Sequence, residues 1–239
     1  MTFHATQGNT NELIHIHLEH SDTAASTRQL KPGCVLLETQ TSEVILKFQS
    51  PDAGLDESVR LVNEVAALDL ARRALDTFDV VPSVFGYGKL EHESRVISWM
   101  IQEFMPGEVL GGAWNELSLS DKETLLPQIA EIYAALQKCA LPSTVESFGG
   151  LQYNGTGALI SGPIVFGYGG PYASLEEMYI SMFKKQLELA DLCPIVKGWS
   201  GSKKGLRASL ERFTNEGISS CFAGVSNKTP TLIHGDFGM

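Results

Sequence analysis

The chain has 239 residues, of which 43% are hydrophobic and 19% are charged, and its formal net charge is -10. This length can form one large domain or two lobes around a sizeable core. The acidic balance and the lack of a Lys/Arg block argue against nucleic acid and anionic membranes as main partners. Four widely spaced cysteines, a polar N-terminus and the lack of an apolar run of ~20 residues predict a cytoplasmic protein with reduced thiols.

The first hundred residues alternate strand patterns with one helical pattern. Residues 13–18 predict a strand that places His15 and His17 on one face. Residues 35–39 and 44–48 flank a polar turn, as in a hairpin. Two registers remain open for the sheet that these strands would form.

A single helix is predicted in this region. Asp56 is placed to cap it, and the helix is expected to run to Leu75. Its apolar stripe consists of Leu61, Val65, Leu68 and Leu75. Two further strands, 84–90 and 96–104, complete a β-rich unit over residues 1–104, and a short connector at 105–107 follows.

From residue 108 onward the pattern is mainly helical. Ser120 opens a capping box with Glu123, and Ser174 opens a second one with Glu177, so helices are predicted after both. A third helix is expected over 203–215. The Gly-rich stretch 148–171 reads as turns and short strands. The sequence thus predicts an α+β protein with a helical part over 108–239.

Lys47 ends an apolar strand pattern, and Glu64 lies in the helix that follows. A strand–helix ion pair between them would hold the ammonium against the α- and β-phosphates of a nucleotide. Glu57 is the alternative partner, although its place in the first helical turn suits the helix dipole better. Both partners remain open at this stage, and Glu64 is favoured.

Two further segments suit nucleotide binding. Gly8 and Asn11 precede the first clear strand, where a glycine turn lets backbone N–H groups approach phosphate. An ordinary hairpin turn explains this segment equally well. The strand 96–104 and the turn that begins at Met105 resemble a hinge, in which the Glu103 carbonyl and the Met105 amide would bond the adenine edge, with Gln102 at the back of the pocket. A core strand ended by Pro-Gly is the alternative.

The last residues carry the sharpest motif, His234-Gly235-Asp236 after an apolar run. Asp236 is the predicted catalytic residue: it would orient a substrate hydroxyl and accept its proton as the γ-phosphoryl group moves, with His234 beside it. Protein kinases carry a metal-holding Asn five residues after this Asp. That position would fall beyond Met239, so we expect a truncated and nearly inactive form of the enzyme.

No metal site is predicted from side-chain clusters. His15, His17 and His20 are candidate ligands, but the sequence places no Cys or carboxylate cluster near them. A solvated strand face is the simpler interpretation.

Taken in order, these segments resemble the aminoglycoside phosphotransferase-like branch of the protein-kinase-like superfamily, in particular its fungal members. Further segments of the resemblance are Asn63-Glu64-Val65, residues 81–88, Phe148 to Leu151, Gly170-Pro171-Tyr172 and Lys197-Gly198-Trp199. The resemblance implies a bilobal protein-kinase-like fold with a β-rich N-lobe and an incomplete C-lobe. It also implies ATP with Mg²⁺ and transfer of the γ-phosphoryl group to a hydroxyl of an unknown small molecule. A non-catalytic nucleotide-binding or protein-interaction module is the alternative function.

Overall fold

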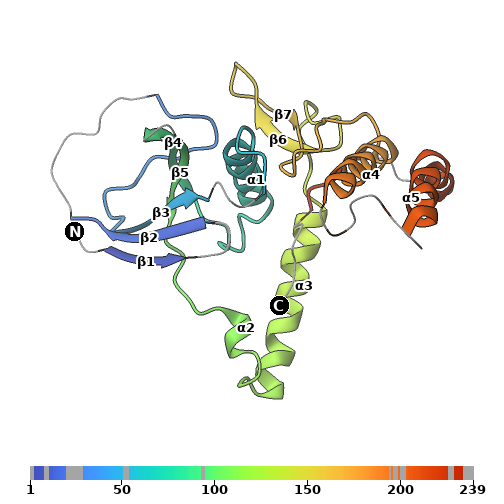
Figure 1. Cartoon of the computed structure of the whole chain (residues 1–239). Helices are drawn as coiled ribbons and strands as arrows, with labels where there is room; N and C mark the ends of the chain where they lie inside the picture. Colours follow the sequence, from blue (N-terminus) through green and yellow to red (C-terminus); the bar gives the residue numbers. More distant parts are fainter. Residues whose placement is uncertain are drawn as a thin grey trace.

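The computed structural model describes residues 3–7, 11–19, 29–50, 54–92, 95–193, 195, 199, 203–225 and 229–233. Its N-terminal part is a five-stranded antiparallel sheet with the strand order β1-β2-β3-β5-β4, flanked by one helix, α1 (Figure 1). The strands are β1 (Phe3–Gln7), β2 (Asn11–His17), β3 (Glu43–Gln49), β4 (Val84–His92) and β5 (Arg95–Glu103).

The register of β2 on β3, which the sequence left open, pairs His15 with Ile45 and His17 with Glu43. The hairpin predicted between residues 35–39 and 44–48 is wrong. Because β3 pairs with β2 on one side and with β5 on the other, no edge of β3 is left for residues 35–39. That segment has no regular structure, and its contact with the sheet includes a 2.9 Å hydrogen bond from the Val35 amide to the Val84 carbonyl.

Helix α1 runs over Arg60–Ala74. It packs Leu61, Val65 and Leu68 of the predicted stripe into the core with the sheet, whereas Leu75 lies just beyond its end. Leu61 and Val65 form a core cluster with Val84 of β4 and Met100 of β5. Each of these side chains is at most 3% exposed, and burial of that kind stabilises the fold by about 1.5–3 kcal/mol per large apolar side chain. The helix begins later than predicted because Asp56 caps a preceding turn, where its carboxylate accepts a 2.9 Å hydrogen bond from the Ser58 amide.

The rest of the described chain is mainly helical, as predicted. It contains α2 (Leu110–Ala113), α3 (Leu119–Gln137), α4 (Leu175–Leu192), α5 (Lys203–Arg212), a π-helical segment (Phe213–Gly217) and α6 (Ile218–Phe222). The mixed α+β fold class is therefore confirmed. Within the described residues, no helix is long and apolar enough to cross a membrane.

The capping boxes explain where the two long helices begin. Ser174 caps α4 as predicted, and its hydroxyl accepts a 3.0 Å hydrogen bond from the Glu177 amide. For α3 the predicted box on Ser120 is wrong. Ser118 is the N-cap and Asp121 is its reciprocal partner, since Ser118 takes the extended conformation that an N-cap requires.

A β-hairpin in the Gly-rich stretch lies between the N-terminal sheet and helix α1 on one side and the later helices on the other. Its strands are β6 (Gly150–Tyr153) and β7 (Leu159–Gly162). Figure 1 shows the hairpin between α1 and α4. Tyr153 packs against both buried clusters of the core, so the hairpin covers the side of α1 that faces away from the sheet.

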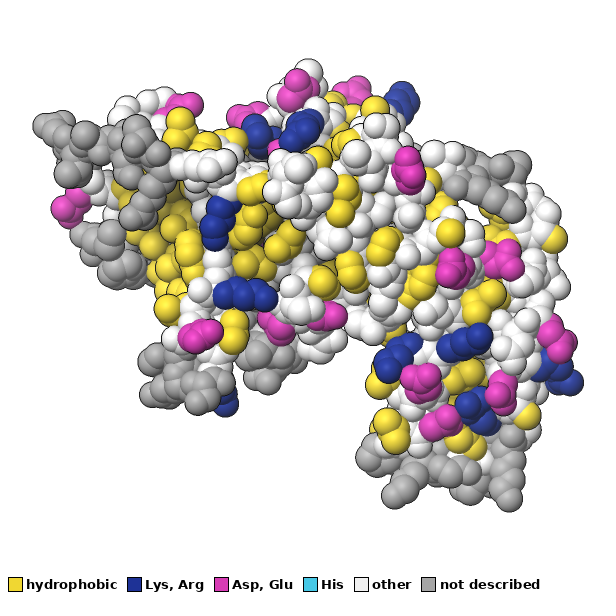
Figure 2. Space-filling view, turned by 90° about the horizontal axis from the view of Figure 1, so that it is seen from above, with side chains coloured by type: hydrophobic (Ala, Val, Ile, Leu, Met, Phe, Trp, Pro, Cys, Tyr) yellow, Lys and Arg dark blue, Asp and Glu magenta, His cyan; other side chains and the backbone are white. Residues whose placement is uncertain are grey.

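Figure 2 views the molecule from above. On the visible face, acidic and basic side chains of the described residues are interspersed. The surface of this face therefore agrees with the mixed charge pattern of the sequence and offers no single basic stripe.

Candidate functional site

Lys47 and Glu64 form the predicted ion pair, from the middle of the sheet to the first half of α1. The Lys47 side chain is 14% exposed and the Glu64 side chain 27% exposed, so the pair is largely withdrawn from water. Gln49, two residues further along β3, donates a 3.0 Å hydrogen bond to the second Glu64 oxygen. The carboxylate is thus fixed from two sides and holds the ammonium in one position, where partial burial strengthens its field.

Glu57, the alternative partner of Lys47, pairs with Arg60 instead, at 3.2 Å. The buried Arg60 guanidinium also donates to the Asn11 side-chain oxygen, at 3.0 Å, and to the Ser50 carbonyl, at 2.9 Å. Asn11 therefore ties the start of β2 to the beginning of α1. Gly8, the other residue predicted in this turn, lies outside the described residues.

The predicted hinge follows directly on the end of β5. Glu103 is anchored to Ser83 by two bonds: its amide donates to the Ser83 carbonyl at 2.8 Å, and its carboxylate accepts from the Ser83 amide at 3.0 Å. Gln102 is half-buried and pairs with Ile45, two residues before Lys47 on β3. Within the described chain the Met105 amide forms no hydrogen bond, and its side chain is 37% exposed. That amide is available to a ligand.

The predicted catalytic residues His234 and Asp236 lie outside the described residues. The described chain ends with residues 229–233, and Leu232 in this segment packs against a core cluster that includes Ala66 and Leu70 of α1. The segment that leads to His234 is therefore held against the same helix that carries Glu64.

A second polar cluster lies on β2 and β3. Nε2 of His15 and Nδ1 of His17 each lie 3.1 Å from the same oxygen of Glu43. The ring of His15 stacks on Phe104 beside the hinge, with centroids 4.1 Å apart. The sequence indicated no Cys or carboxylate cluster near these histidines, but the β2–β3 register places one carboxylate, Glu43, opposite His17. Only the pairing of the two strands reveals this neighbour.

The sequence reading also missed a buried network behind α1. Asp69 is 6% exposed and pairs with Arg73, one turn further along the helix. It also accepts a 3.1 Å hydrogen bond from the Tyr153 hydroxyl. Burial, together with the negative charge of Asp69, raises the pKa of the Tyr153 phenol well above its ordinary value. The network therefore joins the hairpin to the helix through a phenol that stays protonated.

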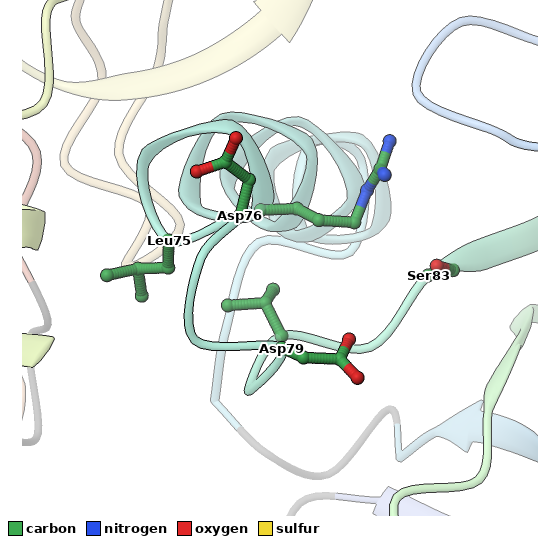
Figure 3. Close-up of a pocket in the computed structure, with 6 residues that line it drawn as sticks. Leu75, Asp76, Asp79 and Ser83 are labelled. Carbon is green, nitrogen blue, oxygen red and sulfur yellow. The ribbon is translucent and has the colours of Figure 1, made fainter.

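A small pocket lies at the C-terminal end of α1 and in the loop to β4 (Figure 3). It is lined by Arg72, Leu75, Asp76, Asp79, Val81 and Ser83. From Glu64 to Arg72 the helix advances about 12 Å. Neither Lys47 nor Glu64 lines this pocket, although Ser83 in its lining also bonds Glu103 at the end of β5.

Comparisons with known proteins identify the family of the chain. The chain is 29% identical over 105 residues to "Altered inheritance of mitochondria protein 9, mitochondrial" from Candida tropicalis. This match covers 43% of the chain and 17% of that relative, so the chain spans only a small part of the curated protein. No solved structure matches the chain. The model of the phosphotransferase enzyme family (APH) matches residues 34–238, and the chain therefore belongs to this family.

Proposed function

We propose that this protein is an ATP-dependent phosphotransferase that transfers the γ-phosphoryl group to a hydroxyl of a small molecule. The ion pair between Lys47 and Glu64 is the observation that carries the proposal. A largely buried ammonium is suited to bind an anion such as a phosphate group. The Glu64 carboxylate holds the Lys47 ammonium in position for that contact. The family match over residues 34–238 supports the same reaction class.

The residues present suit a nucleotide. The Lys47 ammonium would contact the phosphates, and the free Met105 amide would donate to the adenine edge beside the Glu103 carbonyl. Mg²⁺, when bound together with ATP, would supply positive charge that stabilises the transfer. Asp236 and His234 are proposed to orient the acceptor hydroxyl and take its proton. We divide the chain for this purpose into a nucleotide-binding part, 1–104, a hinge, 105–107, and an acceptor part, 108–239.

Isothermal titration calorimetry of the full chain with MgATP tests the proposal by measuring the ATP dissociation constant. Lys47→Met is expected to weaken binding at least about tenfold, the cost of removing one member of a partly buried charge pair. Lys89→Met is the matched control, because Lys89 is an exposed lysine on β4, an edge strand of the same sheet. Equal ATP affinity in wild type and Lys47→Met would contradict the nucleotide site.

Phosphoryl transfer is measured separately, as ADP formed in the presence of a panel of hydroxyl compounds that includes amino alcohols and sugars. Acceptor-dependent ADP formation that is lost in Asp236→Asn supports the enzyme. ATP binding without transfer to any acceptor would instead identify a nucleotide-binding module.

A further inference from the structure

We propose that His15, His17 and Glu43 form a binding site for a divalent transition metal ion, Zn²⁺ in the first place. The site goes beyond the proposed phosphotransferase function and does not depend on it. Three ligand atoms, one from each side chain, lie within 4.8 Å of one another. Two imidazoles and one carboxylate are a donor set for Zn²⁺ and similar ions, whereas Mg²⁺ prefers oxygen ligands only.

Strand geometry explains how the three side chains meet. His15 and His17 are alternate residues of β2 and therefore project from the same face of the sheet. Glu43 is the direct partner of His17 on the antiparallel strand β3, so its side chain rises from that face beside the two rings. The cluster is built on two paired strands of the five-stranded sheet, which are more rigid supports than loops.

The distances fit coordination. Ligands of one tetrahedral zinc ion, each about 2.0–2.2 Å from the metal, lie about 3.3 Å or slightly more from each other. Nε2 of His15 and Nδ1 of His17 each lie 3.1 Å from one Glu43 oxygen. Small side-chain rotations bring this spacing to the coordinated value.

Simple ion pairing explains the cluster less well. Nε2 of His15 is shielded from solvent and, within the described part of the chain, makes no hydrogen bond, although the Glu43 oxygen lies 3.1 Å away. The ring nitrogen and the carboxylate are thus close without being aligned for an N–H···O bond. A buried polar atom without a partner is costly, and a metal ion placed between the two groups would satisfy it.

The neighbouring residues hold the His15 ligand in place and leave the His17 and Glu43 ligands accessible to solvent. Stacking on Phe104 fixes the His15 ring. The His17 and Glu43 side chains are 44% and 35% exposed, so the ion can enter from solvent and keep water as a further ligand.

Titration of the metal-free full chain with Co²⁺, without nucleotide, tests the site by the visible absorption of tetrahedral Co²⁺, with Zn²⁺ as competitor. One Co²⁺ per chain is expected, displaced by Zn²⁺. Glu43→Gln and His17→Asn should each weaken binding at least about a hundredfold, since even an outer partner of a metal ligand is worth ten- to a hundredfold. Both variants keep the His15–Phe104 stack, so the fold is expected to survive, and melts in EDTA verify this.

Glu12→Gln is the matched control, because Glu12 is an exposed carboxylate of β2 on the opposite face of the strand. It should bind Co²⁺ as tightly as the wild type. Three results would overturn the site: no Co²⁺ binding to the wild type, unchanged binding in the Glu43→Gln/His17→Asn double variant, or sulfur-to-cobalt charge-transfer bands that assign the ion to a cysteine. Loss of ATP binding in Lys47→Met with normal Co²⁺ binding would show that the two sites are separate.

Discussion

Tyr153 on the hairpin strand β6 donates a 3.1 Å hydrogen bond to Asp69 on α1, a buried carboxylate that also pairs with Arg73. Tyr153→Phe removes this bond while keeping the ring in the core. We expect the free energy of unfolding to fall by about 1–3 kcal/mol, the range for a hydrogen bond to a charged group. Urea denaturation measures the change. Tyr179→Phe, at a more exposed tyrosine of α4, should leave stability unchanged.

The same tyrosine predicts how stability responds to alkaline pH. Because burial and Asp69 raise the pKa of the Tyr153 phenol above its ordinary value near 10, the unfolded chain loses this proton first as pH rises. The contribution of Tyr153 is therefore fully present below pH ~10 and is lost above it. Unfolding free energies measured from pH 8 upward should fall more steeply for the wild type than for Tyr153→Phe. Parallel curves would contradict this assignment.

Gly150 of the hairpin lies against Asn63 of α1. A Cβ atom at this position would lie 2.0 Å from the Asn63 amide nitrogen and 2.2 Å from the Pro163 carbonyl oxygen. Gly150→Ala should therefore push the hairpin away from the helix and cost about 1–3 kcal/mol of stability. Gly155→Ala is the control, since a Cβ at that turn position meets no atom within 4 Å. Thermal melts of the two variants that coincide would show that the hairpin does not pack as described.

Leu61 tests whether the core between α1 and the sheet carries the stability of the fold. Its side chain is 2% exposed, so Leu61→Ala is expected to cost about 2–5 kcal/mol. Leu90 on β4 is 52% exposed, and Leu90→Ala should change stability by no more than about 0.5 kcal/mol. Chemical denaturation of both variants gives the comparison, and similar losses would place the core elsewhere.

Substitutions of Glu64 and Glu57 test in solution which of the two carboxylates is the partner of Lys47. Glu64→Gln removes the charge that orients the ammonium and should weaken MgATP binding about tenfold. Glu57→Gln removes only the pair with Arg60, whose guanidinium keeps its bonds to Asn11 and Ser50, and should bind MgATP as the wild type does. The reverse pattern, measured by the same calorimetric titration, would reassign the partner.

The cysteines offer a test of burial that needs no substitution. Burial raises the pKa of the Cys34 and Cys139 thiols, whereas Cys221 is exposed. Because the thiolate is the reactive form, Cys221 should be alkylated by iodoacetamide well before the other two at pH 8. Peptide mapping at successive times measures the order, and equal rates would contradict it.

Local patterns predicted the elements whose periodicity is strong. Helix α1 and the strands 84–90 and 96–104 were found from local patterns of apolar residues, and the structure has them at Arg60–Ala74, Val84–His92 and Arg95–Glu103. The strand expected at 35–39 was wrong because local propensity cannot show that β5 already occupies the free edge of β3. The start of α3 moved to Ser118 because two overlapping Ser-x-x-acid patterns compete there.

The contacts of the candidate site also fall into two kinds, those that local sequence predicts and those that only the tertiary fold creates. Lys47 and Glu64 lie close in sequence, and their pairing follows from a strand that runs into a helix. Glu43, by contrast, becomes a neighbour of the histidines only through the register of β2 on β3. Asp69 and Tyr153 are far apart in the chain and meet only in the packed fold.

Helix α1 touches the sheet through Glu64 and the hairpin through Asp69. One rigid helix therefore fixes the position of the hairpin relative to the Lys47 ammonium, because both contacts belong to the same fifteen-residue element.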